Sequence, residues 1–139
     1  MKKILLLACT ATALSACTTV HNTQLKSSQS YQVEWIGERP LIDSSMLTLT
    51  LVDDQHAAGL AGCNHWSANY QLNGGTLSLS DIATTRKLCA PALMEQEQRF
   101  LAHLARTQRW EFVEHQQLLL WPEHGEPIKL WPIESQLNN

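Results

Sequence analysis

The cysteines of this chain could act as nucleophiles, bind a metal, carry a lipid or form disulfides. The four cysteines are Cys9, Cys17, Cys63 and Cys89. Cys63 and His65 would share one face of a strand, so a reactive thiol beside a base is one interpretation of this pair. No further residue completes a nucleophilic site around them, and two cysteines without closely spaced histidines do not make a zinc site. The cysteines therefore predict neither a catalytic nor a metal centre.

Familiar catalytic motifs are missing from the sequence. It contains no Gly-x-Ser-x-Gly, no His-Glu-x-x-His and no glycine-rich phosphate loop. The six histidines are scattered, and none is paired with a carboxylate at the spacing of metal ligands. Asp53, Asp54 and His56 lie close together, but their segment has the composition of a turn, which favours a solvated turn over a site. We therefore expect a protein that is not an enzyme and that needs no cofactor.

The N-terminus has the pattern of an export signal. Lys2 and Lys3 precede an apolar stretch, residues 4–14, which is too short to span a bilayer and fits the core of a secretory signal. The sequence Leu14-Ser15-Ala16-Cys17 then resembles the bacterial lipobox. That resemblance implies cleavage after residue 16 and attachment of diacylglycerol to the sulfur of Cys17. The alternative is an ordinary secreted protein in which Cys17 remains a free thiol.

Lipid attachment would fix the protein to a membrane. The resemblance implies two or three fatty acyl chains, such as palmitate, and two chains hold stably where one chain is marginal. Thr18, and not an aspartate, follows Cys17. In Gram-negative lipoproteins this pattern implies the outer membrane, and we expect the domain to face the periplasm. Residues 17–30 are polar and lack periodicity, so we interpret them as a flexible tether with a root-mean-square span of roughly 20 Å.

The mature chain has the size and charge of one small acidic domain. Removing the 16 signal residues from 139 leaves a chain that, without its tether, suffices for one domain, predicted over residues 31–134. Because Lys2 and Lys3 leave with the signal, 8 basic residues face 13 acidic ones. This balance argues against nucleic acid as a partner, and against attachment to anionic lipid by charge.

Two cysteines remain in the mature domain once Cys9 has left with the signal and Cys17 carries lipid. Cys63 and Cys89 are then an even pair in an oxidising compartment, which predicts a disulfide between them. The bond would close a loop of 26 positions and contribute about 3–4 kcal/mol through chain entropy.

Period-two alternation dominates the domain. Leucine alternates with threonine over residues 47–52, and Trp66, Ala68, Tyr70 and Leu72 would share one strand face. Asn73-Gly74-Gly75 predicts a tight hairpin turn, because asparagine and glycine tolerate positive φ. Gly59 and Gly62 predict a bulge or a close approach of two backbones. Further strands are expected over residues 31–36, 57–61, 76–79, 110–112, 117–121 and 128–131.

One segment has helical periodicity. Residues 91–107 begin with a proline, which suits the first position of a helix, and place Leu93, Phe100 and Leu104 on one side. Residues 80–90 lack periodicity and predict a long loop. About eight short strands and one helix indicate an α+β fold that is mainly antiparallel β, a strongly curved sheet or partly open barrel with the helix packed on it. We expect the five tryptophans mostly to fill the core, with the lining of a pocket as the alternative.

The motif Gly62-Cys63-Asn64, followed by Trp66 and Tyr70, resembles the signature of the HslJ/META-domain family. Thr85 with Cys89 four residues on resembles the second motif of the family, although the family often has Met where Lys87 stands and Trp near Tyr31. The similarity covers about residues 31–132. It implies small exported domains linked to heat shock and envelope stress, with no established enzymatic activity. It also implies that Gly62, Cys63, Asn64, Thr85 and Cys89 are structural.

Three functions remain open on these grounds. The first is a non-enzymatic envelope lipoprotein that contacts another envelope protein, and Arg86 with Lys87 in the predicted loop is the candidate contact surface. The second is a carrier of a small apolar ligand or a lipid in the barrel. The third is a pilot-like chaperone of an outer-membrane protein, because the family fold resembles that of lipoprotein pilots.

Overall fold

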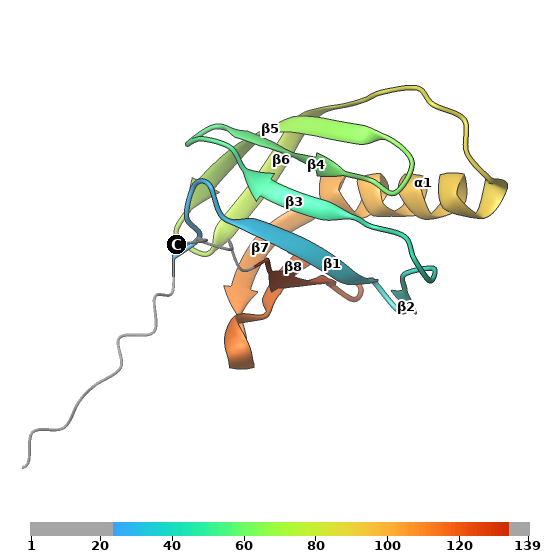
Figure 1. The fold of residues 1–139 in the computed structure, drawn as a ribbon. Helices are drawn as coiled ribbons and strands as arrows, with labels where there is room; N and C mark the ends of the chain where they lie inside the picture. The colour runs from blue at the N-terminus through green and yellow to red at the C-terminus, as the bar shows by residue number, and fades with distance from the viewer. Residues whose placement is uncertain (1–23, 134–139) are drawn as a thin grey trace, which may run out of the picture.

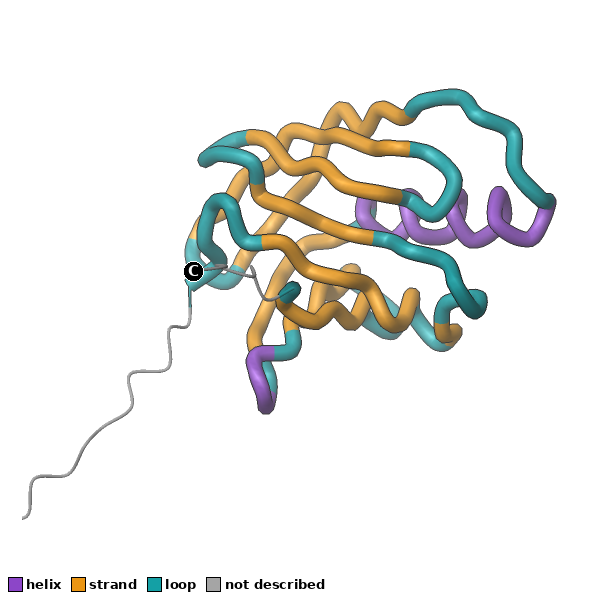
Figure 2. Tube along the Cα trace, in the orientation of Figure 1, coloured by secondary structure: helices purple, strands orange, loops and turns teal. Residues whose placement is uncertain are grey.

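A computed structural model of the chain describes residues 24–133, so the predicted signal, Cys17 and most of the predicted tether lie outside the described residues. The described part is built mainly of strands with one α-helix (Figures 1 and 2). The elements are β1 (Ser30–Ile36), β2 (Arg39–Pro40), β3 (Thr48–Leu51), β4 (His56–Leu60), β5 (His65–Asn73), β6 (Thr76–Thr84), α1 (Pro91–Ala105), β7 (Thr107–Phe112), the 3-10 turn η1 (Glu114–Gln116), β8 (Leu118–Pro122) and β9 (Ile128–Pro132).

The strands form a closed antiparallel barrel. Neighbours in the sheet follow the order β2-β1-β3-β4-β5-β6-β7-β8-β9, and β1 also pairs with β9. Eight strands therefore complete the ring, while the short β2 is an extra strand that folds back on the end of β1. The predicted fold class, mainly antiparallel β with one helix, is confirmed, and the ring is closed rather than partly open.

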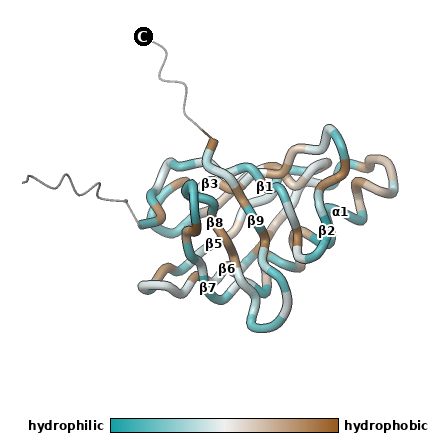
Figure 3. The backbone as a smooth tube through the Cα atoms, turned by 90° about the horizontal axis from the view of Figure 1, so that it is seen from below, coloured by the Kyte–Doolittle hydropathy of each residue, from teal (hydrophilic) through white to brown (hydrophobic). Residues whose placement is uncertain are grey.

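The core occupies the inside of this ring. Alternate residues of β1, β3, β5 and β6 point inward, as the sequence pattern predicts for strands with one buried face. In β8, which is brown along much of its length in Figure 3, Leu118, Leu119 and Leu120 are all buried. Leu118 and Leu120 join the inward residues of the other strands in the hydrophobic core, so the fold is a packed barrel without an empty channel.

The two ends of the barrel differ. We call the end where β1, β4 and β6 finish the helix end, because α1 lies there, on the right in Figure 1. Phe100 and Leu104 of α1 are fully buried in the core, and the Phe100 ring meets Trp66 edge to face at 6.0 Å. We call the opposite end the open end. It carries the β3–β4, β5–β6 and β7–β8 turns, and the described chain enters β1 there.

Two loop predictions need correction. The segment 80–90 is not a loop throughout, because β6 continues to Thr84 and pairs with Trp66 and Ser67. Asp81 has φ 54° and lies where the register shifts, so a β-bulge breaks the alternation that identifies a strand in sequence. The folded part also begins before residue 31, because Leu25 is buried in the core and the backbone N–H of Ser28 donates to Leu51.

The tryptophans do not mostly fill the core. Only Trp66 is fully buried among them, whereas the indole of Trp131 is exposed and its N–H donates to Glu34 at 2.8 Å. Trp110 and Trp121 are half-buried and likewise donate to oxygens, those of Gly74 and Glu111. These rings lie over the outer wall and the open end, where an apolar face can pack while the N–H finds an acceptor.

Two glycines explain the tight join between β3, β4 and β5. A Cβ on Gly59 would collide with the backbone carbonyl of Thr48, so only glycine allows the two strands to approach this closely. Gly62 has φ 101°, which turns the chain immediately before Cys63 and Asn64. The predicted close approach is therefore present, at the point where the chain returns from β4 into β5.

Burial of Tyr31 gives a testable pH dependence. Its side chain is almost completely buried, and loss of hydration raises the pKa of the phenol to about 12. The pKa of Tyr31 in the folded protein lies above the ordinary value of about 10. The contribution of the buried, protonated phenol to folding stability is therefore complete below pH 10. It is lost as the pH rises toward 12. We expect tyrosinate absorbance in the native protein to appear well above pH 10, and Tyr31→Phe to remove the late step. Formation of all tyrosinate near pH 10 would contradict the burial of this ring.

Candidate functional site: a loop held by Asn64 and a disulfide

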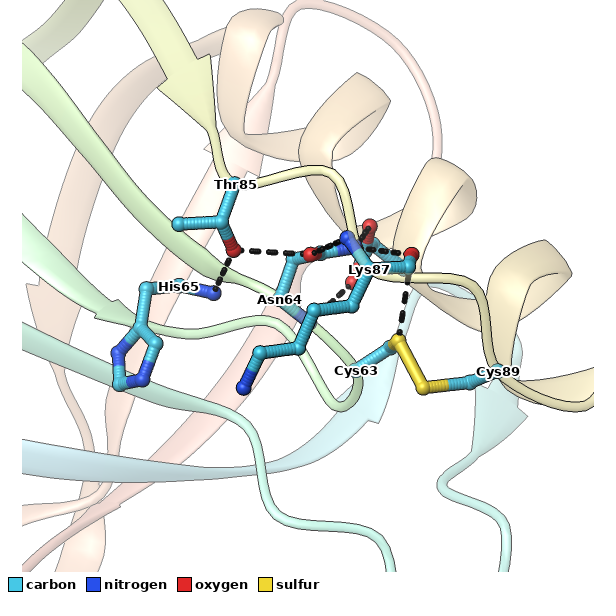
Figure 4. The surroundings of a disulfide bond; sticks show 7 residues. Cys63, Asn64, His65, Thr85, Lys87 and Cys89 are labelled. Carbon is cyan, nitrogen blue, oxygen red and sulfur yellow. Dashed lines mark hydrogen bonds between the residues drawn. A yellow bond between two sulfur atoms is a disulfide. The ribbon is translucent and has the colours of Figure 1, made fainter.

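The segment Thr85–Ala90, which joins β6 to α1, is the candidate site; we call it the pinned loop. Its anchors are the family-motif residues of the preceding turn, and Figure 4 shows them together. Cys63 and Cys89 form a disulfide, with their Cα atoms 6.0 Å apart. The Sγ atom of Cys63 also contacts the carbonyl oxygen of Lys87 at 3.6 Å. We regard this as a contact and not a hydrogen bond, because a disulfide sulfur carries no proton.

Asn64 provides the central anchor. Its Oδ1 accepts from the Lys87 backbone N–H at 2.7 Å and from Thr85 Oγ1 at 2.8 Å, while its Nδ2 donates to the Lys87 carbonyl at 3.2 Å. Asn64 thus bonds both backbone groups of Lys87, as a neighbouring strand would. The carboxamide takes the place of a strand partner, and the loop keeps an extended path without one.

Glu97 of α1 completes the hydrogen-bond network around Asn64. Its Oε2 accepts from the backbone N–H of Asn64, and its Oε1 accepts from Asn64 Nδ2, both at 2.8 Å. Asn64 and Glu97 are 2 % and 4 % exposed. With these bonds, both donors and both acceptor positions of the Asn64 side chain are occupied. Within residues 24–133 no ion pair involves Glu97, so its buried charge depends on these hydrogen bonds.

Sequence reasoning did not single out Glu97 and so missed its role. The signal was present, because Leu93, Glu97, Phe100 and Leu104 are spaced by four, three and four residues and share one helix face. Gln96 is buried beside it, where Oε1 accepts from the Ile42 backbone N–H at 2.7 Å. A search for apolar residues alone overlooks Gln96 and Glu97, because it assumes that polar residues of a helix face the solvent.

The remaining candidate residues are distributed as follows. Arg86 and Lys87 are both exposed on the pinned loop, next to Leu88, whose side chain is 94 % exposed. Cys63 is oxidised, so the interpretation as a reactive thiol beside His65 is wrong for this state. The Thr85 hydroxyl also accepts from the His65 backbone N–H at 3.1 Å, which ties the start of the loop to β5.

Asp53 and His56 lie in the solvated turn between β3 and β4, on the open end. Asp53 Oδ1 accepts from the backbone N–H groups of Gln55 and His56, each at 2.8 Å, and the imidazole of His56 contacts the same carboxylate. The pKa of Asp53 is lowered, first by the bond from Gln55 and then by the bond from the His56 side chain. These contacts cap a turn, as the sequence predicts for this segment. Across residues 24–133 no three His, Cys, Asp or Glu side chains gather as a metal site.

The arrangement therefore holds the backbone of the pinned loop in place and leaves the Arg86 and Leu88 side chains exposed for contact. The anchors fix alternate points of the loop, and the side chains between them remain free in solvent. A loop ordered in advance loses little conformational entropy when it meets a partner. None of the helices among the described residues has the length and apolar character needed to cross a membrane.

Comparisons with known proteins agree with this geometry. The family model of the META domain matches residues 23–135. An NMR structure of a protein from Burkholderia xenovorans has a similar fold, with a TM-score of 0.67 and 24% identity over 78% of this chain and 84% of that one. A second NMR structure gives a TM-score of 0.60 at 21% identity, over 75% and 88% of the two chains. No curated protein is similar enough to count as a match. The match to the family model spans most of the chain, and the protein belongs to the META domain family.

Proposed function

We propose that the protein is a non-enzymatic, lipid-anchored protein of the outer membrane that binds another envelope protein through the pinned loop. The observation that supports this most directly is Leu88. This leucine side chain is 94 % exposed beside two cations on a loop fixed by a disulfide and by Asn64, so the loop offers a preformed apolar and cationic contact. Apolar side chains presented on a rigid scaffold are typical anchors of protein interfaces.

The chemistry of the partner follows from the loop. Arg86 and Lys87 immediately precede Leu88 and bring two positive charges to the loop, although the mature chain as a whole is acidic. The complementary surface would have an apolar pocket for Leu88 and carboxylates at its edge. Met46 is also exposed at the helix end and would extend the apolar contact. A link to heat shock or envelope stress is part of the proposal and rests on the resemblance to the family.

The carrier hypothesis is supported less well. Its proposed location, the barrel interior, is filled by the buried side chains of the core, including Phe100, Leu104 and Leu120. A pilot-like chaperone would use the same kind of contact with an outer-membrane protein, and the experiment below covers it. The pinned loop is therefore the place to test first.

A photo-reactive amino acid at position 88 tests the contact in living cells. We expect one crosslinked product at this position, and none with the probe at Gln71, an exposed strand residue. The product should disappear in the R86E/K87E variant and persist in K26E, a charge reversal at the open end. Equal crosslinking at positions 88 and 71, or a product unaffected by R86E/K87E, would contradict the loop as the contact surface.

The anchor has its own test. Intact mass spectrometry of the protein extracted from its membrane should give a chain that begins at Cys17, carries the acyl groups and is two hydrogens lighter for the Cys63–Cys89 bond. The Cys17→Ala variant should lose the acyl mass and leave the membrane fraction. A mature chain with an unmodified Cys17 would support the ordinary secreted protein instead. A further mass released by denaturation would favour the carrier.

A further inference from the structure

A cleft of about 700 Å³ opens on the end of the barrel opposite the pinned loop. Its walls are mainly apolar and come from Leu25, Leu72, Trp110 and Phe112. At Gly75 an added Cβ would meet no atom within 4 Å, so side chains leave this part of the cleft unfilled. The volume lies in the range of small-ligand sites, but the cleft is shallow and open to one side.

The polar atoms of the Trp110 and Glu111 side chains, which line the cleft, already have partners. Trp110 Nε1 donates to the Gly74 carbonyl at 3.0 Å, which leaves its ring as apolar surface. Glu111 accepts from Trp121 Nε1 at 2.7 Å and lies 3.7 Å from the guanidinium of Arg109. The cleft therefore offers apolar contact area, and few of its polar atoms require a new hydrogen bond.

Further apolar side chains surround the cleft on the turns of the same end. Val52 lies at the β3–β4 turn, Val113 at the β7–β8 turn and Ile133 directly after β9. They are 52%, 40% and 38% exposed, and Leu72, in the β5–β6 hairpin, is 40% exposed. Each connection of the open end thus carries one exposed aliphatic residue. With the cleft they make the open end rich in apolar surface, although Lys26, Asp53 and Asp54 are exposed there as well; we call this surface the end face.

The position of the anchor indicates what covers this face. Gln24 and Leu25 line the cleft, and Cys17 stands seven residues before Gln24. Seven residues of polar chain have a root-mean-square span of about 15 Å and reach about 25 Å when extended. The pinned loop is farther away, because β6 alone, nine residues long, spans about 30 Å. The open end is therefore the part of the domain nearest to a lipid on Cys17.

We propose that the open end of the barrel rests on the bilayer that holds the Cys17 lipid, with Leu72 and Trp110 in the interfacial layer. This inference rests on the proposed anchor. Tryptophan favours the interface between hydrocarbon and water, and the tether keeps the face at a high effective concentration near the lipid. Because Asp53, Asp54 and Glu111 also lie at this end, the contact depends on apolar burial rather than on attraction by charge, and added salt should not weaken it.

Quenching by brominated lipid tests the orientation. The acylated full-length mature protein is reconstituted into phosphatidylcholine vesicles with bromine on the acyl chains near the ester, and its fluorescence is compared with that in unbrominated vesicles. We expect the emission of Trp110, obtained as the difference between the parent and W110F, to be mostly lost. W110F keeps a ring to pack on Phe112, and L72E provides a second variant, in which the quenching of Trp110 should fall. As a matched control, L88W in the W110F background should show no added quenching.

The possible results distinguish failure of the proposed anchor from failure of the membrane contact. Protein that fails to float with the vesicles contradicts the anchor and the membrane contact together. Protein that floats while Trp110 stays unquenched contradicts the membrane contact alone. Quenching of the tryptophan introduced by L88W would show the opposite end on the membrane, and quenching that high salt removes would show attachment by charge. Either result would overturn the inference.

Discussion

Replacing Asn64 with alanine is expected to lower the free energy of unfolding by about 3–5 kcal/mol. The change removes the acceptor of the Lys87 amide and one of the two donors that stabilise the Glu97 carboxylate. Glu97 is buried without an ion pair among the described residues. Its carboxylate would therefore lose a hydrogen-bond donor that no other group replaces. Urea unfolding followed by tryptophan fluorescence measures the loss as a shift of the midpoint at constant slope.

Asn69 provides the matched control for this variant. It is also an asparagine of β5, but its Nδ2 donates to Asp81 on the exposed side of the barrel. Asn69→Ala should change stability by about 0.5 kcal/mol or less. The double variant N64A/E97L should cost less than the sum of the single changes, because it removes the stranded charge together with its partner. A cost of N64A as small as that of Asn69→Ala would show that the network contributes little.

Removing the disulfide with C63A/C89A is expected to cost about 3–4 kcal/mol, since the bond closes a loop with a sequence separation of 26. The effect acts mainly on the unfolded chain, which regains conformational freedom. The pinned loop itself should stay ordered, because Asn64 still binds both backbone groups of Lys87. Unfolding with and without reductant measures the global effect, and hydrogen exchange of the Lys87 amide measures the local one.

The two variants should therefore have opposite local effects. In C63A/C89A the Lys87 amide should remain protected from exchange in the native state, whereas in N64A it should exchange quickly although the disulfide is intact. Rapid exchange in both variants would mean that the disulfide, and not the carboxamide, holds the loop. The crosslink at position 88 should therefore be lost in N64A, where the loop is disordered, and kept in C63A/C89A, where the loop stays ordered although the protein is less stable.

The fold was predictable where alternation was regular. Residues 47–51 and 66–70 place their apolar side chains inward as the pattern indicates, and Pro91 begins the helix as expected. Prediction failed at Asp81, where one extra residue in the strand shifts the period and hides the second half of β6. Closure of the ring was also beyond local patterns, because it depends on β1 meeting β9 from the other end of the chain.

The candidate site was only partly predictable. The resemblance to the family singled out Cys63, Asn64, Thr85 and Cys89. A resemblance marks positions, but it does not show which residues contact each other. The partnership of Asn64 with Glu97 joins residues 33 positions apart, and no local rule connects them. Leu88 drew no attention in the sequence, because an isolated leucine carries no pattern and its exposure is decided by tertiary structure.

Closure of the ring between β1 and β9 also determines when folding can finish. Gln32 pairs with Trp131, so the first strand waits for a partner that is synthesised nearly a hundred residues later. A chain that emerges N-terminus first leaves this edge of β1 unpaired until the last strand is out, and unpaired edges invite association with other chains. Contacts between distant parts of a chain also slow folding. The nascent protein is therefore most vulnerable to aggregation just before its final strand is available. A chaperone that binds unfolded chains would have its greatest effect on the yield of folded protein at that stage.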